Sequence, residues 1–187
     1  MKSAIFLFGL MLLLNSAVIA RPDYQSYYSD VETPAVWMNP RNIKVYIQPD
    51  ETKQYILTRS LETWDSALSS DLNFNYINNP DEADIIIGFV DKLSGTKAGT
   101  TNVNHVNIQG RTYLAKVVVY ISKASPSGMR HTDTELNKIT LHELGHAIGI
   151  LGHSDNINDI MYPTTASSRM ATLSSKDIET AKRIYGF

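Results

Sequence analysis

Two histidines and a glutamate in the second half of the chain have the residue types and the spacing to do chemistry on a metal ion. His142 and His146 are four residues apart, so on a helix both imidazoles lie on one face, a turn apart, where they can bind one ion. Glu143 directly follows the first histidine, so its carboxylate leans toward the same ion without needing to ligate it. The pattern His-Glu-x-x-His is therefore a candidate metal site with a base beside it.

This pattern spans five residues and occurs by chance in long helices, so two exposed helical histidines are the alternative. The next residues favour a metal site. Gly149 can turn the chain sharply out of the helix, because glycine tolerates a positive φ, and His153 comes four residues later. Three neutral imidazoles and one open position are the arrangement of catalytic zinc. We predict one catalytic Zn²⁺ bound by His142, His146 and His153, and the predicted catalytic base is Glu143.

The segment from His142 to Pro163 resembles a clan of zinc peptidases. It reads HELGHAIG from His142, HS at His153 and DIMYP from Asp159, which looks like the metzincin clan. Within that clan it is most similar to the matrixins, the matrix-metalloproteinase-like peptidases, because a serine after the third histidine and Met-Tyr-Pro downstream are matrixin features. The resemblance implies that Met161 forms an apolar floor under the zinc, and that role is compatible with ordinary core packing.

The resemblance covers roughly Pro40–Phe187 and implies a secreted zinc-dependent endopeptidase that hydrolyses extended protein substrates. In such an enzyme Glu143 takes a proton from zinc-activated water and passes one to the leaving amine. The substrate is then expected to lie antiparallel to an edge strand near Ala98–Val103. The expected substrate contacts are Ala98 and Gly99 on that strand, with Pro163, Thr164 and Thr165 on the opposite wall after the methionine.

The spacing departs from the family pattern before the third histidine. The clan pattern His-Glu-x-x-His-x-x-Gly-x-x-His places two residues after the glycine, whereas this chain has three, of which Gly152 is the extra one. A glycine offers no ligand, so we expect the chain to reach His153 through a bulge that glycine makes easy, with Asp155 as the alternative third ligand. Tyr162 is not assigned as a ligand, because the zinc-binding tyrosine of some metzincins lies two residues after the methionine, where this chain has Pro163.

Other matrixin features are missing from the sequence. Beyond the three candidate ligands the chain has only His105 and His131, too few for the second, structural zinc of vertebrate matrixins, and we expect both in surface loops. Calcium is not expected, because the Asp- and Gly-rich calcium loops of that group are not evident. The chain has no cysteine, so a cysteine cannot hold it latent. Either Asp23 or Asp30 caps the zinc from an acidic N-terminal arm, or that arm is a disordered tail.

The N-terminus predicts export. A positive start at Lys2, an apolar run and small residues ending at Ala20 predict a signal peptide. The run is short for a membrane span, which needs about 20 residues, so an uncleaved anchor is the less favoured alternative. The predicted organisation is a signal peptide (1–20), an extension or short propeptide (21–39) and a catalytic domain (40–187) of a secreted protein.

Composition limits the remaining classes of function. The chain of 187 residues has a net charge of −2 and no long basic cluster, so neither nucleic acid nor a polyanionic partner is expected. After removal of the signal we expect no membrane association, a monomer, and a protein or peptide as substrate. An exported chain without cysteine must rest its fold on its apolar core, to which a bound metal can add stability.

Hydrophobic periodicity outlines the elements that must position these residues. Alternating or β-branched runs predict strands, and apolar residues at helical spacing or capping-box pairs predict helices. The predicted strands are Ile43–Gln48, Phe74–Ile77, Asp84–Phe89, an edge strand in Ala98–Val103, and Tyr113–Ser122; the predicted helices are Thr52–Ser69, Thr132–Gly149 and Ser174–Tyr185.

The order of these elements, strand, helix and then several strands, predicts an α/β (α+β) fold with a mixed sheet and a helix behind it. The apolar strand Asp84–Phe89 is expected at the sheet centre, covered on both faces. The resemblance adds detail: a metzincin-like catalytic domain with a mixed, mostly parallel, five-stranded twisted sheet, two long helices behind it and a C-terminal helix.

Two other functions remain open at this point. One is a secreted zinc-binding module on a catalytically inactive peptidase scaffold; inactive relatives usually lose the glutamate, whereas Glu143 is present. The other is a non-metzincin zinc hydrolase that uses two histidines and a distant carboxylate, against which Gly149, His153 and Met161 argue.

Overall fold

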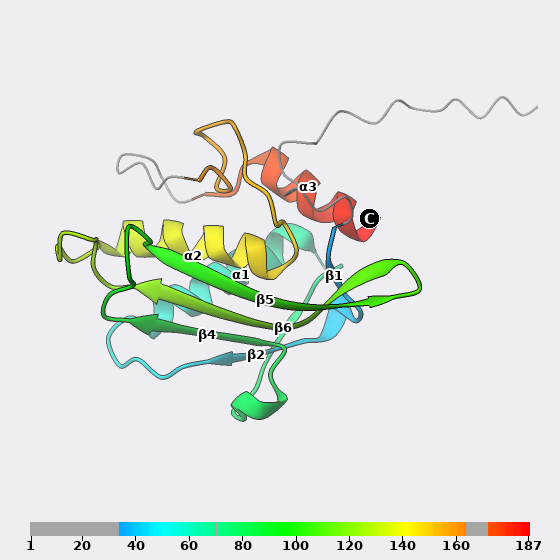
Figure 1. Cartoon of the computed structure of the whole chain (residues 1–187), viewed down its shortest axis with the longest axis horizontal. Helices are drawn as coiled ribbons and strands as arrows, with labels where there is room; N and C mark the ends of the chain where they lie inside the picture. The colour runs from blue at the N-terminus through cyan, green and yellow to red at the C-terminus, as the bar shows by residue number, and fades with distance from the viewer. Residues whose placement is uncertain (1–33, 70, 164–171) are drawn as a thin grey trace, which may run out of the picture.

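The computed structural model describes residues 34–69, 71–163 and 172–187 (Figure 1). The predicted signal peptide, Asp23 and Asp30, and the predicted substrate contacts Thr164 and Thr165 lie outside the described residues. Three α-helices are described: α1 (Gln54–Leu68), α2 (Asp133–Ala147) and α3 (Ser175–Tyr185). Short 3₁₀ turns occupy Pro40–Asn42 and Pro80–Glu82.

One sheet of six strands forms the centre of the fold. The strands are β1 (Val36–Trp37), β2 (Ile43–Ile47), β3 (Phe74–Tyr76), β4 (Ile85–Val90), β5 (Gly99–Ile108) and β6 (Arg111–Ser122). Their order is β1-β6-β4-β2-β3 with parallel pairing throughout, and β5 pairs with β6 in antiparallel orientation. The predicted fold class, a mixed and mostly parallel sheet with three helices, is therefore confirmed, and a short strand, β1, adds to the five expected.

The position of β1 bears on the predicted domain boundary. Val36 and Trp37 pair with Tyr113 and Leu114 of β6, and both are buried in the core. They precede the boundary predicted at Pro40, so part of the predicted extension packs as a strand of the domain. A two-residue strand is too short to show a periodic pattern in the sequence.

The sheet buries one face more deeply than the other. Along β4, Ile85 and Ile87 are fully buried, whereas Ile86 between them is half-buried. The same alternation runs along β6, where Val117 and Val119 are fully buried. The prediction that β4 is covered on both faces is therefore wrong: α1 and α2 both lie over one face (Figure 1). A continuous apolar run does not by itself distinguish these cases, because residues on a half-covered face can still be apolar.

Helix α1 contributes the stripe predicted from its sequence. Its core-facing residues have at most 1% exposed surface, and they are Leu57, Leu61, Trp64 and Leu68. The indole Nε1 of Trp64 donates a hydrogen bond to the carbonyl oxygen of Leu141 at 3.0 Å, which ties α1 to the middle of α2. No helix among the described residues combines the length and the apolarity needed to cross a membrane.

The starts of α2 and α3 are fixed by local capping, as predicted. The side chain of Thr132 accepts from the backbone N–H of Glu135 at 3.3 Å, and Glu135 accepts from the backbone N–H of Thr132 at 2.7 Å. Ser174 and Asp177 make the equivalent reciprocal pair at the start of α3. These boxes satisfy backbone donors that have no partner within the helix.

Candidate metal centre

Helix α2 presents the candidate ligands and the candidate base on one side of the molecule. His142 and Glu143 are buried, with 8% and 7% of their surface exposed. The helix lies alongside β5, the edge strand (Figure 1). The helical part of the site is therefore built as the four-residue spacing predicted, against a strand that pairs on one side only among the described residues.

A tight turn after α2 brings the third histidine back to the helix. Gly149 has φ +102°, and a Cβ there would collide with the carbonyl oxygen of Ala35 on the segment leading into β1. Only glycine fits this backbone conformation and this close approach. The following loop is held by Ser154, whose N–H donates to the carbonyl oxygen of Met161 at 2.8 Å and whose Oγ donates to Asp159 at 2.6 Å.

The three candidate ligands converge. The ring centroid of His142 lies 4.8 Å from that of His146 and 5.2 Å from that of His153, and the last two centroids are 4.9 Å apart. One nitrogen from each ring can be chosen so that all three lie within 4.8 Å of one another. The additional residue before His153 therefore does not prevent its ring from joining the other two.

Backbone carbonyls fix the orientation of two of these rings. Nδ1 of His142 lies 2.7 Å from the carbonyl oxygen of Ile160, and Nδ1 of His146 lies 2.7 Å from that of Ile150. A carbonyl oxygen can only accept, so we assign the proton of each neutral ring to Nδ1. This tautomer leaves the lone pair on Nε2, as in histidines that ligate metals.

Burial also keeps the imidazoles neutral. Loss of hydration lowers the pKa of His142 from 6.5 to about 4 and the pKa of His146 to about 3. Burial lowers the pKa of His153 as well, although this ring is more exposed than the other two. Neutral imidazoles are the form that binds a metal ion.

This donor set fits zinc. Tetrahedral zinc takes imidazole nitrogens at about 2.0–2.1 Å, which places two such nitrogens about 3.3 Å apart. The upper limit of 4.8 Å between the candidate nitrogens needs only a small closing of the rings. Three neutral nitrogen ligands without a carboxylate are the set of a catalytic site that keeps one position for water or substrate.

Glu143 lies beside the three histidines and is buried, but burial shifts the pKa of a carboxyl group upward. Burial raises the pKa of its carboxyl from 4.5 to about 7, while a hydrogen bond from Thr101 and the charge of Lys97 oppose that rise. Thr101 Oγ1 lies 2.6 Å from Oε2 of Glu143. A carboxyl whose pKa is near neutral can both take up and release a proton.

Two residues beneath the site complete its support. Met161 is fully buried, and a Cβ on Gly145 would collide with its sulfur, so this glycine lets the methionine pack directly against α2. Asp177 of α3 accepts from the backbone N–H of Ile160 at 2.9 Å and of Met161 at 3.3 Å. The same carboxylate therefore caps α3 and fixes the turn that carries Met161.

Sequence reasoning did not anticipate Thr101 or the second role of Asp177. The capping-box spacing from Ser174 signalled Asp177 as a helix cap, but its contact with Ile160 spans 17 residues and depends on the tertiary fold. The Thr101–Glu143 contact spans 42 residues, and no local pattern signals it.

Some of the other candidates differ from expectation. Asp155, the alternative ligand, points elsewhere: it is exposed and lies 3.8 Å from Lys176. His131 lies in a loop as predicted but is half-buried beside Glu135, whereas exposed His105 lies on β5 rather than in a loop.

The expected substrate contacts are only partly described. Gly99 begins β5, and the carbonyl oxygen of Ala98 accepts from the N–H of Ser122 at 2.8 Å. Pro163 follows the buried Met161 and is exposed. Thr164 and Thr165, the other two contacts expected on the opposite wall, lie outside the described residues.

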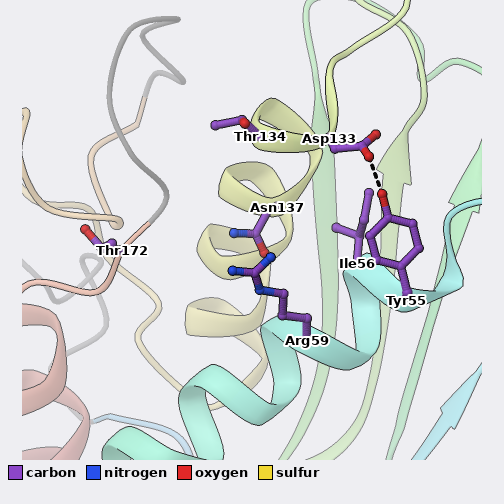
Figure 2. A pocket seen from close by; sticks show the side chains of 7 residues that line it. All are labelled: Tyr55, Ile56, Arg59, Asp133, Thr134, Asn137 and Thr172. Atoms are coloured by element: carbon purple, nitrogen blue, oxygen red, sulfur yellow. Dashed lines mark hydrogen bonds between the residues drawn. The ribbon is translucent and has the colours of Figure 1, made fainter.

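A well-formed hollow lies away from the histidines. It has a volume of about 340 Å³ and is lined by residues of α1, the first turns of α2, and Thr172 (Figure 2). Here Asp133 interacts with Tyr55 and Lys53 at the surface. His142, His146 and His153 do not line this hollow, nor do they line either of two others, of about 440 and 210 Å³.

Comparisons with known proteins identify the family of the chain. The family model described as Matrixin matches residues 37–186. "Metalloendoproteinase 1-MMP" of Arabidopsis thaliana is 24% identical over 152 residues, covering 75% of this chain and 40% of the relative. A "Putative matrix metalloproteinase" of Trichoplusia ni ascovirus 2c is 28% identical over 169 residues, covering 79% of this chain and 33% of the relative. The chain thus spans well under half the length of these relatives.

A solved structure shows the same fold. The structure of myroilysin superposes with a TM-score of 0.52 at 13% identity, covering 81% of this chain and 82% of that chain. At this identity the similarity concerns the fold alone.

Proposed function

The chain belongs to the matrixin family of zinc metalloendopeptidases, and from this membership we propose that it is itself an active zinc-dependent endopeptidase. The observation that supports the proposal most strongly is the convergence of three neutral imidazoles beside a buried carboxyl group. His142, His146 and His153 are the proposed zinc ligands, and Glu143 is the proposed general base.

A zinc ion on these three imidazoles would supply a water acidified to a pKa near 7 and would polarise the scissile carbonyl group. Glu143 accepts the proton of the attacking water, and its carboxyl then delivers a proton to the nitrogen of the leaving amine. Ile160 and Ile150 hold the rings of His142 and His146 through their Nδ1 atoms. Met161 supports α2 from below.

The proposed substrate is an extended protein or peptide segment. Strand β5 pairs only with β6 among the described strands, so its outer edge can pair with a substrate backbone in antiparallel orientation. Ala98 and Gly99 are the proposed contacts on that edge, with Pro163, Thr164 and Thr165 on the opposite wall. We further propose that residues 1–20 direct secretion and that the catalytic domain begins by Val36, the first residue of β1, because this strand is part of the sheet.

The test is Glu143→Ala in the full chain, expressed for export. The variant should retain zinc but lose cleavage of casein or a peptide library by about 10²–10⁴-fold, the usual contribution of a general base. Glu62→Ala is the matched control, because Glu62 is an exposed glutamate on α1. A Glu143→Ala protein that cleaves as fast as the wild type would remove Glu143 from the mechanism.

The rival function, a zinc-binding module on an inactive scaffold, gives a distinct outcome. It requires a wild-type protein that binds one zinc ion but cleaves neither casein nor any library peptide. Reversible loss of cleavage on chelation, restored by zinc, would instead support the enzyme.

A further inference from the structure

One hydroxyl group contacts the candidate base from outside its own helix. Thr101 Oγ1, on β5, lies 2.6 Å from Oε2 of Glu143 and 3.0 Å from the backbone carbonyl oxygen of the same residue. A separation of 2.6 Å is typical of a hydroxyl that donates to an ionised carboxylate. We propose that Thr101 is a positioning residue that fixes the carboxylate of Glu143 for proton transfer; this inference rests on the proposed function.

The carboxylate is confined from a second direction on the same strand. Gly99 and Thr101 are two residues apart on β5, so both positions face α2. A Cβ built on Gly99 would lie 2.6 Å from Oε1 of Glu143, which is closer than real Cβ contacts occur. The carboxylate therefore occupies the space that glycine leaves free, with Thr101 against its other oxygen.

This arrangement distinguishes the two carboxylate oxygens. Oε2 is engaged by the hydroxyl of Thr101, so Oε1 is the oxygen that exchanges a proton with the attacking water and then with the leaving amine. In this step the O–H bond of water breaks and an O–H bond forms at Oε1. That bond breaks in turn when the amine nitrogen takes the proton, so Glu143 ends ionised as it began.

The hydroxyl can serve both protonation states without moving its oxygen. With Glu143 ionised, Thr101 donates to Oε2. With Glu143 protonated, the same hydrogen can turn to the backbone carbonyl oxygen at 3.0 Å, while a lone pair of Oγ1 still faces Oε2. A side chain that kept the shape of threonine without its hydroxyl would lose both interactions.

The experiment compares Thr101→Val, which keeps the shape, with Thr101→Ser, which keeps the hydroxyl. Thr101→Val should lower kcat by about 10–100-fold with KM within about 3-fold of wild type, and Thr101→Ser should restore kcat to within about 3-fold. Zinc affinity, measured by competition with a chromophoric chelator, should be unchanged in both. Thr112→Val, at a buried threonine of β6 in the distal part of the hairpin, is the matched control for loss of a hydroxyl from a strand.

A second variant, Gly99→Ala, keeps the test informative if Thr101→Val fails to fold. Gly99→Ala reaches the same carboxylate from the other side without altering the hydroxyl, and it should also lower kcat while zinc affinity is kept. In a Glu143→Ala background Thr101→Val should cause no further loss, because the group it positions is gone.

The outcomes separate this inference from the proposed function. A wild-type protein that binds zinc but does not cleave would overturn both. If the wild type cleaves and Glu143→Ala does not, Thr101→Val with a wild-type kcat would overturn the positioning role alone. Equal losses in Thr101→Ser and Thr101→Val would also overturn it, since the serine variant retains the hydroxyl.

Discussion

The two ends of helix α2 present polar side chains in opposite ways. At its first turn Asp133 is half exposed and contacts Lys53. It also accepts a hydrogen bond from the hydroxyl of Tyr55, and Asp133 and Tyr55 both line a hollow (Figure 2). At its other end His142 and Glu143 are more than nine-tenths buried, and each has a partner fixed by the fold.

The difference teaches which features mark the candidate site. The hollow at the first turn has a volume of about 340 Å³, but its charged groups remain in contact with water and so gain little from their pairing. His142, His146 and Glu143 line none of the three hollows described above, yet burial strongly shifts their pKa values. Burial together with fixed hydrogen-bond partners, rather than concavity, distinguishes the candidate site from the first turn of α2.

The largest effect is expected from removing a ligand. His153→Ala should lower zinc affinity by about 10³-fold, because one of three ligands supplies about a third of a binding free energy of ~12 kcal/mol. Asp133→Asn, at the opposite end of the helix, should leave zinc affinity unchanged. Competition with a chromophoric chelator measures both zinc affinities. Equal affinities in the two variants would show that the two ends of α2 do not differ in their importance for zinc binding.

The next effect concerns pH in the metal-free protein. The lowered pKa values of His142 and His146 mean that stability is lost as pH falls from 6.5 to about 4, because the unfolded chain binds protons first. The raised pKa of Glu143 acts oppositely, since the folded protein binds its proton first as pH falls through about 7 to 4.5.

Glu143→Gln removes the stabilisation that proton uptake by Glu143 gives the folded protein as pH falls. Between pH 7 and 4.5 the metal-free variant should lose more free energy of unfolding than the wild type, by on the order of 3 kcal/mol. Urea denaturation in the presence of a chelator, at several pH values, measures the difference. If the free energy of unfolding changed with pH in the same way in both proteins, burial would not raise the pKa of Glu143 as described.

A third effect tests the packing beneath the histidines. Gly145→Ala adds a methyl group against the sulfur of Met161, and overpacking of this kind should lower the free energy of unfolding by up to about 3 kcal/mol. Leu144→Met, a near volume-conserving change at the buried neighbouring position, should cost less than about 1.5 kcal/mol. A Gly145→Ala protein as stable as the wild type would mean that Met161 is free to move away.

The smallest effect is expected on the free energy of unfolding when one of two aspartates is replaced. Asp177→Asn should lower the free energy of unfolding by about 2 kcal/mol, because the amide cannot accept all the backbone N–H groups that the buried carboxylate serves. Asp133→Asn should produce no measurable change, since that carboxylate is exposed. Equal costs for the two substitutions, measured by urea denaturation, would contradict the contrast.

Local patterns in the sequence predicted the parts of the molecule that local interactions build. The capping boxes at Thr132 and Ser174 and the pair His142 and His146 each involve residues three or four apart, so helical geometry alone relates them. His153 was predicted from the turn expected at Gly149 and from the ligand set of catalytic zinc, but the sequence could not show that this turn packs against the segment before β1.

Contacts between distant segments were not predictable in this way. The length of β5 is an example: Asn104 and Asn107 are of a residue type depleted in strands, yet pairing with β6 continues β5 to Ile108, beyond the predicted end at Val103. A tight turn with positive φ at Gln109 and Gly110 joins the two strands. Thr101 approaches Glu143 only because β5 is held against α2.

Zinc K-edge X-ray absorption on the purified protein tests the central claim most directly. One zinc ion per chain with three nitrogen ligands at about 2.0–2.1 Å is the predicted result, and His153→Ala should lose one of the three. A wild-type protein without zinc, or a three-nitrogen shell that survives in His153→Ala, would contradict the metal centre described for α2 and the loop after it.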